Sequence, residues 1–200
     1  MHLFFDVDGV LLNFEKAFVR FLNDRKGKAL PEDYETDCWF FSEILKPEEM
    51  RAAWLGFLDS EYSAEIPPLV APEKFNTLSH HHTVHLLTNF PIPYKEKRER
   101  NLRDLGMKFD SLHYCGLHSF KGEHPSTTKS EKIDQLRANG EAGFFIDDQP
   151  DNCLDVLENC ESVDVWLMSR RFNLEFSHPE ISRADAWEIL FDHLGNGSRG

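Results

Sequence analysis

Short apolar runs alternate along the chain with longer stretches in which apolar side chains recur every three or four residues. The apolar runs predict five strands, at residues 2–6, 83–88, 111–116, 143–147 and 163–168. The helical spacing predicts helices between and after them, at residues 93–105, 128–138, 151–159 and 184–194. Strands that alternate with helices favour right-handed βαβ units. We therefore predict an α/β fold, with a Rossmann-like parallel five-stranded sheet and helices on both faces.

The segment between the first two predicted strands is far longer than a crossover helix requires. Within it, Phe14, Phe18 and Phe21 follow helical spacing, and residues 47–58 predict a further helix with proline at its first turn. We interpret this segment as an insertion into the α/β unit. The predicted domains are a core of residues 1–13 and 71–200 and a small helical cap of residues 14–70.

Two carboxylates close the first predicted strand. Asp6 and Asp8 are two residues apart and face the same way on an extended strand, and Gly9 then permits a sharp turn. Ligands of open α/β sheets bind beyond the carboxyl ends of the strands. Close carboxylates repel each other, and Mg²⁺ held by carboxylates, water and a substrate phosphate removes that repulsion. For this strand alone, an ordinary Asp-Gly turn is the alternative.

The fourth predicted strand repeats the arrangement, because its apolar run ends in Asp147 and Asp148, with Asp151 close behind. A helix N-cap would explain Asp151 but not the adjacent pair. Acidic residues that end two strands of one parallel sheet can meet around a single cation. The two strands together therefore predict a site for a metal ion and a phosphate.

Three further polar residues suit a phosphate. Thr88 and Asn89 end the second predicted strand, where a hydroxyl and an amide can donate hydrogen bonds to phosphoryl oxygens. Lys129 falls in the first turn of its helix, and its ammonium could neutralise both a nucleophile and a phosphate. Lys132 is the alternative for this lysine.

Composition limits the partners. Lys and Arg number 22 against 35 Asp and Glu, for a net charge of −13, which argues against binding a nucleic-acid polymer but permits a small anion held by a metal. No apolar run approaches the roughly 20 residues that span a bilayer, and the first strand leaves no room for a signal peptide. The 4 cysteines form no CxxC pair. We therefore expect a cytoplasmic protein with reduced thiols.

The histidines before the second strand have a simpler interpretation than a metal site. His80, His81 and His82 are adjacent, with His85 close behind, and adjacent side chains diverge whereas zinc ligands are spaced. We predict a solvated turn. Cys153 and Cys160, seven residues apart on a predicted helix, are expected to pack on one face.

Taken in order, these residues resemble the haloacid dehalogenase (HAD) superfamily of phosphohydrolases. The resemblance rests on the DxDGV sequence that begins at Asp6, on Thr88, on Lys129 and on the pair Asp147 and Asp148, and it covers essentially the whole chain. It implies the HAD fold, and the helical insertion is similar to the cap with which that superfamily closes over its substrate.

A narrower resemblance is to the 5′(3′)-deoxyribonucleotidase-like branch. The sequence IDDQPD at residues 146–151 is similar to that branch's fourth motif, and residues 182–190 look like its C-terminal helix. Two features depart from the branch: Asn89 stands where it often has Ser, and Lys129 lies further from the acidic pair. The resemblance implies a nucleoside pocket lined by Trp39, Phe40 and Phe41.

The superfamily resemblance implies a Mg²⁺-dependent phosphomonoesterase that acts through an aspartyl-phosphate. Asp6 would be the nucleophile, and Asp8 the general acid and then the general base. Mg²⁺ would be held by the Asp6 carboxylate, the Asp8 main-chain carbonyl and Asp147, and Asp148 would orient metal-bound water. The phosphoryl oxygens would be held by Thr88, Asn89 and Lys129.

Several functions remain open at this point. We expect a small phosphorylated metabolite as substrate, with a nucleoside monophosphate as the first choice and a sugar phosphate as the second. A dehalogenase of the same superfamily is a third alternative, but such enzymes lack the second aspartate, so Asp8 counts against it. A non-catalytic module that binds a phosphorylated ligand is the fourth. The sequence does not indicate an oligomeric state.

Overall fold

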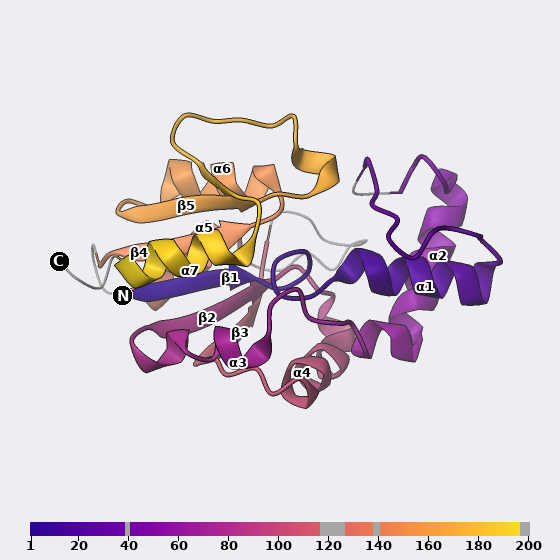
Figure 1. Cartoon of the computed structure of the whole chain (residues 1–200), viewed down its shortest axis with the longest axis horizontal. Helices are drawn as coiled ribbons and strands as arrows, with labels where there is room; N and C mark the ends of the chain where they lie inside the picture. The colour runs from indigo at the N-terminus through magenta and orange to yellow at the C-terminus, as the bar shows by residue number, and fades with distance from the viewer. Residues whose placement is uncertain (39–40, 117–126, 138–140, 197–200) are drawn as a thin grey trace.

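The computed structural model describes residues 1–38, 41–116, 127–137 and 141–196. Its centre is a six-stranded sheet, parallel throughout, in the order β3-β2-β1-β4-β5-β6 (Figure 1). The strands are β1 (His2–Asp6), β2 (Thr83–Thr88), β3 (Ser111–Tyr114), β4 (Gly143–Asp147), β5 (Val163–Met168) and β6 (Ser182–Ala184). The strand order reverses between β1 and β4. Ligands of open α/β sheets bind at the carboxyl ends beside such a point.

The prediction of a parallel α/β sheet is confirmed, but its count of five strands was wrong. Ser182–Ala184 forms β6 beside β5, and helix α7 begins at Trp187 rather than at residue 184. The segment lacks the alternation of a half-buried strand, and it is extended because its backbone pairs with β5. The predicted bounds agree for β1, β2, β4 and β5, whereas β3 ends at Tyr114.

Helices follow most strands and cover both faces of the sheet. The α-helices are α1 (Phe14–Lys26), α2 (Pro47–Asp59), α3 (Pro72–Phe75), α4 (Lys95–Asp104), α5 (Lys129–Leu136), α6 (Pro150–Asn159) and α7 (Trp187–Asn196). Short 3₁₀ helices are η1 (Glu61–Ala64), η2 (Leu78–His80), η3 (Ile92–Tyr94) and η4 (Arg171–Asn173). Within the described ranges, no helix combines the length and the apolar character that crossing a membrane requires.

Alternate residues of the strands form two cores. Leu3 and Phe5 of β1 pack with α3, α4 and α7 on one face, whereas Phe4 packs with α5 and α6 on the other. The second core holds both Cys153 and Cys160, as their spacing predicts. The polar residues at the carboxyl ends of the strands are therefore held by a sheet that is packed on both faces.

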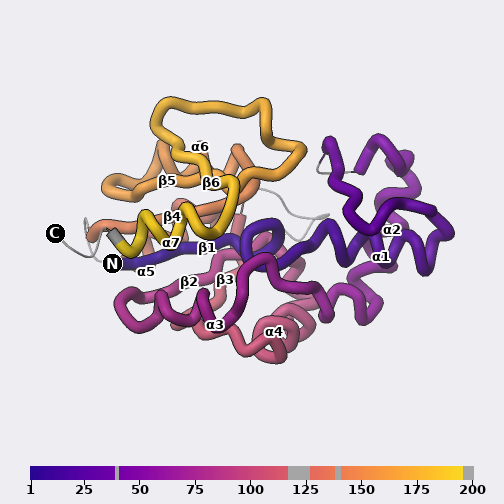
Figure 2. The backbone as a smooth tube through the Cα atoms, viewed as in Figure 1, coloured from indigo at the N-terminus to yellow at the C-terminus, as the bar shows by residue number. Residues whose placement is uncertain are grey.

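The helical insertion lies beyond the carboxyl end of β1, at the opposite side of the sheet from the two termini (Figure 1). Its own aromatic core includes Phe18 and Phe57, whose ring centroids lie 5.3 Å apart. The two linkers that join it to the sheet run side by side, with Asn13 N donating to Pro67 O at 2.8 Å (Figure 2). The role of these helices as a cap stays a prediction.

The histidines divide into two groups. His80 and His81 are exposed in the turn before β2, as predicted. His85, however, is not part of a solvated turn: it is 6% exposed in the middle of β2 and stacks on Phe4 with ring centroids 5.0 Å apart. The alternation of β2 turns His85 toward the core that also holds Leu87.

Candidate active site

Three carboxylates meet at the reversal point of the sheet. Asp6 ends β1, Asp147 ends β4 and Asp148 follows it; each offers an oxygen within 4.8 Å of the others. The three side chains are almost completely buried, with Asp6 the most exposed at 5%. Buried like charges raise the free energy of the folded protein unless a cation lies among them. The arrangement therefore demands positive charge at this point.

Lys129 supplies part of that charge. Its Nζ donates to Asp147 Oδ2 at 2.5 Å and to Asp6 Oδ1, and the side chain is fully buried. The predicted capping box holds the start of its helix, because Thr128 Oγ1 accepts from Glu131 N at 3.2 Å and Glu131 Oε2 accepts from Thr128 N at 2.9 Å. Lys132, the alternative lysine, instead donates to Gln135 Oε1 at 2.6 Å. The structure thus brings Lys129, not Lys132, to the acids.

The electrostatics of this cluster favour cation binding. Burial raises the pKa of Asp6, the positive charge of Lys129 opposes that rise, and the negative charge of Asp147 adds to it. Burial also raises the pKa of Asp148, which faces the charges of Asp6 and Asp147. Burial alone would lower the pKa of Lys129, but the two carboxylates it contacts outweigh burial and raise it. One ammonium therefore serves several acids, and a further cation would be bound favourably.

The turn after β1 lies directly against Asp148, which follows β4. Gly9 has a φ of +84°, and a Cβ at this position would lie 1.8 Å from Asp148 Oδ2, so only glycine fits. Arg170, which follows β5, donates from Nε to Gly9 O at 2.7 Å. Asn173 Nδ2 donates to Asp148 O at 2.8 Å. These contacts fix the turn after β1 against the acidic pair.

Asp8 lies at the edge of this cluster and faces helix α4. Arg98 Nη2 donates to both of its carboxylate oxygens, at 2.7 and 2.8 Å. The Arg98 side chain is completely buried, and 16% of the Asp8 side chain is exposed. Burial raises the pKa of Asp8, against the opposing charges of Arg98 and Lys129. Asp8 is thus the partly accessible carboxylate of the site.

Thr88 and Asn89 lie at the carboxyl end of β2, beside β1. Thr88 is 1% exposed, and its Oγ1 accepts from Phe90 N at 3.1 Å, which leaves its hydroxyl proton available. Asn89 packs against Gly116, where a Cβ would lie 2.0 Å from Asn89 Oδ1. Gly116, which we did not select from the sequence, is therefore the residue against which Asn89 packs.

The donor set suits a hard divalent cation. Asp148 Oδ2 and Asn152 Oδ1 are buried without a hydrogen-bond partner among the described residues, and Asn89 Oδ1 shares this property. Asn152 Nδ2 donates to Asp147 Oδ2 at 3.1 Å. Buried oxygens are rarely left unpaired, so these atoms indicate a ligand or water. Carboxylate and amide oxygens are the ligands of Mg²⁺, and the residues present fit it.

Only one of the three residues predicted to line the nucleoside pocket is among the described residues. Trp39 and Phe40 lie outside the described residues. Phe41 is completely buried and packs on Phe18 with ring centroids 5.0 Å apart. The structure therefore places Phe41 in the core of the insertion rather than on a surface that could contact substrate, because its neighbours on α1 cover its ring.

Sequence reasoning missed Arg98 and Asn152, although each left a signal. Helix α4 is highly charged and its buried residues are Arg98, Asn101 and Leu102. Arg98 is four residues before Leu102 and so shares the face that carries an apolar residue. Asn152 follows Asp147 by five residues, which returns it to the same strand end across the first turn of α6.

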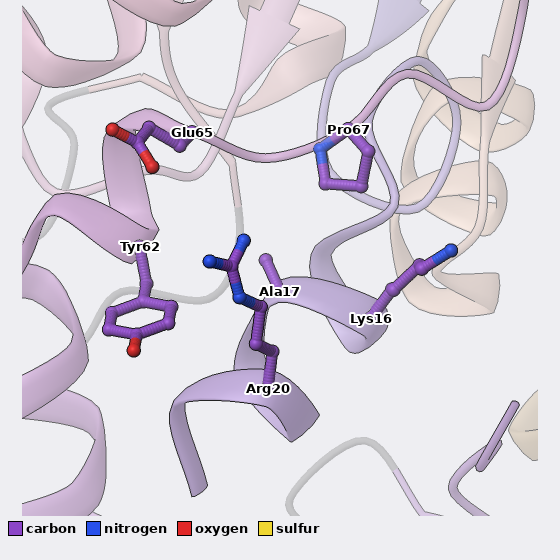
Figure 3. A pocket seen from close by; sticks show the side chains of 6 residues that line it. All are labelled: Lys16, Ala17, Arg20, Tyr62, Glu65 and Pro67. Atoms are coloured by element: carbon purple, nitrogen blue, oxygen red, sulfur yellow. The ribbon is translucent and has the colours of Figure 1, made fainter. Parts of the chain in front are cut away.

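A separate cavity is lined by residues of the insertion itself (Figure 3). Its volume is about 200 Å³, and its lining residues are Lys16, Ala17, Arg20, Tyr62, Glu65 and Pro67. The Arg20 guanidinium lies 5.3 Å from the centre of the Tyr62 ring. None of the acids of the cluster lines it.

No protein-family model and no curated protein matches this sequence. Solved structures do match over nearly the whole chain. YfnB from Bacillus subtilis, assigned as a HAD hydrolase and solved bound to magnesium, is 18% identical, with a TM-score of 0.60 and coverage of 96% of this chain and 97% of its own. The D,D-heptose 1,7-bisphosphate phosphatase from Burkholderia thailandensis is 10% identical, with a TM-score of 0.51 and coverage of 100% and 99%.

A third similar structure is the L-2-haloacid dehalogenase PA0810, which is 12% identical, with a TM-score of 0.58 and coverage of 98% of both chains. The chain has the fold of the HAD hydrolases. At such identities the likeness establishes the fold alone, and one fold carries both phosphatases and dehalogenases here. The reaction must therefore be argued from the site.

Proposed function

We propose that this protein is a Mg²⁺-dependent phosphomonoesterase of the HAD superfamily that acts through an aspartyl-phosphate on Asp6. The observation that carries the proposal is the buried cluster of Asp6, Asp147 and Asp148 around Lys129, with unpaired oxygens, at the point where the strand order reverses. Perturbed, buried acids at such a position are typical of catalytic sites.

In the first step, an Asp6 carboxylate oxygen attacks the phosphorus atom of the substrate, and the bond from phosphorus to the leaving oxygen breaks. Asp8 donates a proton to that leaving oxygen. In the second step, Asp8 takes a proton from water, the water oxygen attacks phosphorus, and the bond to Asp6 breaks to release inorganic phosphate. Asp8 suits this role because it is the partly accessible carboxylate of the site.

The remaining residues hold charge in place. Asp6, the Asp8 main-chain carbonyl and Asp147 would hold Mg²⁺, with Asp148 orienting its water; bound Mg²⁺ neutralises the phosphoryl oxygens as charge develops on them. Lys129 presents an ammonium between Asp6 and Asp147. Thr88 has a hydroxyl proton to donate, and Asn89 can donate from its amide.

Two alternatives are less well supported by the site. A dehalogenase needs a nucleophilic aspartate but no acid for an oxygen leaving group, and this site holds Asp8 beside Asp6 in a charged hydrogen-bond network. A module that only binds a phosphorylated ligand would not need a partly accessible carboxylate beside the nucleophile. Asp8 therefore favours phosphate ester hydrolysis in both comparisons.

For the substrate, we propose a nucleoside monophosphate, with a sugar phosphate as the second candidate. The support is the similarity of residues 146–151 to the nucleotidase-like branch and the aromatic pair Trp39 and Phe40 in the sequence. One of the similar structures is a phosphatase of a heptose bisphosphate, which supports the second candidate.

The first experiment measures phosphate release from p-nitrophenyl phosphate with Mg²⁺ and with excess chelator. Turnover that needs Mg²⁺ supports the proposal, and turnover that persists in chelator contradicts the metal assignment. A screen of nucleoside monophosphates against sugar phosphates then decides the substrate class. If a nucleotide is preferred, Trp39→Ala should lower its kcat/KM by about 5- to 150-fold, the equivalent of ~1–3 kcal/mol of base stacking, and leave p-nitrophenyl phosphate nearly unchanged.

A further inference from the structure

Arg98 is a charged side chain that is fully buried at the edge of the acidic cluster. Its side chain is 0% exposed, and its Nε is buried without a hydrogen-bond partner among the described residues. A buried ion pair with an unpaired donor contributes little net stability compared with apolar side chains of similar size. Packing alone is therefore a poor explanation for an arginine at this position.

The geometry directs Arg98 at one carboxylate. A single nitrogen, Nη2, donates to both oxygens of Asp8, at 2.7 and 2.8 Å. Charged hydrogen bonds of this kind fix the orientation of a carboxylate as well as its position. Asp8 follows β1 in a loop, where its side chain would otherwise rotate between several conformations.

Arg98 is itself held on two sides. Its Cζ lies 4.2 Å from the centre of the Phe90 ring, and Phe90 N donates to Thr88 Oγ1. Its Nη1 donates weakly to Asn101 Oδ1 at 3.4 Å, and Asn101 Nδ2 donates to Ile66 O at 3.1 Å. Arg98 thus bridges the phosphate-binding end of β2 and the linker that returns from the insertion.

We infer that Arg98 is a positioning residue that aligns the Asp8 carboxylate for proton transfer and that Asn101 supports it. This inference rests on the proposed function. Removing Arg98 should slow the steps in which Asp8 moves a proton, while Asp6, Lys129 and the residues that hold Mg²⁺ stay in place. Residues that orient metal ligands typically change metal affinity or activity by about 10- to 100-fold when replaced, and we expect an effect of similar size for Arg98.

The test compares Arg98→Gln with Arg100→Gln. Arg100 lies on the same helix but forms an exposed ion pair with Glu61, so its replacement should leave activity unchanged. With p-nitrophenyl phosphate, whose leaving group needs little protonation, Arg98→Gln should still phosphorylate Asp6. It should hydrolyse the intermediate roughly 10- to 100-fold more slowly. Phosphoenzyme should therefore accumulate during turnover and be detected after an acid quench. A parallel loss of both steps without accumulation would overturn the inference.

A double-mutant cycle separates positioning from a general loss of structure. If Arg98 acts through Asp8, then adding Arg98→Gln to Asp8→Asn should cause no further loss of kcat. Multiplicative losses would mean that Arg98 acts independently of Asp8 and would overturn the inference. Should Arg98→Gln fail to fold, Arg98→Lys completes the same cycle, because its ammonium keeps the charge but lacks the guanidinium group.

The proposed function is tested first and separately. Wild-type protein without Mg²⁺-dependent turnover would contradict the proposed function itself. Normal wild-type turnover, with an Arg98→Gln variant that behaves like Arg100→Gln, would leave the function standing and overturn only the role of Arg98. Asn101→Leu should repeat the effect of Arg98→Gln to a smaller extent, since it removes the weak support of Nη1 and the hydrogen bonds to Ile66 but keeps the contact between Arg98 and Asp8.

Discussion

Two polar groups of side chains share strand β1 and differ in how completely they are hydrogen-bonded. Toward the amino end, His2, His85, Ser111 and His113 form a continuous chain across β1, β2 and β3, with contacts of 2.9, 2.7 and 2.8 Å. Glu141 Oε2 extends it at 3.1 Å from His2 Nε2. At the carboxyl end, by contrast, carboxylates crowd around one lysine.

The difference indicates a structural role for the histidine chain and a binding role for the acidic cluster. The histidine chain pairs its polar atoms with one another, which is how buried polar groups are normally held in a stable core. The acidic cluster leaves Asp148 Oδ2 and Asn152 Oδ1 without partners and places like charges together. Such an arrangement lowers stability in the absence of a ligand, and it is typical of a binding site.

The largest effect is expected at the nucleophile. Asp6→Asn keeps the shape of the side chain but removes the attacking carboxylate, so kcat should fall by at least about 1000-fold. The fold should be retained, since the change also removes a negative charge from among the acids. Steady-state kinetics and circular dichroism check both points. Activity near that of the wild type would exclude Asp6 as the nucleophile.

The lysine should matter most for stability. Lys129→Met leaves Asp6 and Asp147 buried without their cation, and we expect a loss of about 3–5 kcal/mol in the free energy of unfolding without Mg²⁺. The matched control is Lys132→Met on the same helix, with an expected change of about 0.5 kcal/mol or less. Urea denaturation measures both. Equal effects of the two variants would contradict the special position of Lys129.

Mg²⁺ should stabilise the protein through the acidic cluster. At a free concentration 100 times the dissociation constant, binding adds about 2.7 kcal/mol to the free energy of unfolding. Thermal unfolding at rising Mg²⁺ concentration should therefore show an increasing Tm for the wild type and for Asp151→Asn, whose side chain is exposed. Asp147→Asn should abolish most of the increase. A wild-type Tm that does not change with Mg²⁺ concentration would argue against the metal site.

The histidine chain should respond to pH rather than to metal. Burial and the positive charges of His2 and His113 lower the pKa of His85 to about 4, against a smaller opposing effect of Asp110. The unfolded chain binds a proton near the ordinary histidine pKa of about 6.5, so stability falls as pH drops from there to about 4. His85 contributes about 2–3 kcal/mol of that loss.

Replacing the histidine isolates this contribution. The His85→Phe variant should show a flatter dependence of unfolding free energy on pH between 7 and 4, whereas His81→Gln, an exposed control, should match the wild type. Urea denaturation across that range measures the slopes. Parallel slopes for wild type and His85→Phe would show that the chain of histidines tolerates protonation.

Much of the fold could be predicted because the signals are local. The strands β1, β2, β4 and β5 are apolar runs with clear ends, and the capping box of Thr128 and Glu131 marks the start of α5. The segment Ser182–Ala184 carries no such signal, and it becomes β6 only because β5 offers it an open edge. Sequence pattern reports local preference, whereas strand pairing depends on what folds alongside.

The same division applies to the site. The sequence alone determined that Asp6, Asp8 and Asp147 stand at or just after strand ends. Side chains two residues apart on a strand face the same way, and the carboxyl ends of parallel strands lie at one edge of the sheet. Only the tertiary structure decided that Lys129 joins Asp6 to Asp147, that Arg98 holds Asp8, and that Phe41 packs inside the insertion. These outcomes depend on contacts between residues distant in the chain, and the packing of whole helices against the sheet selects which side chains meet.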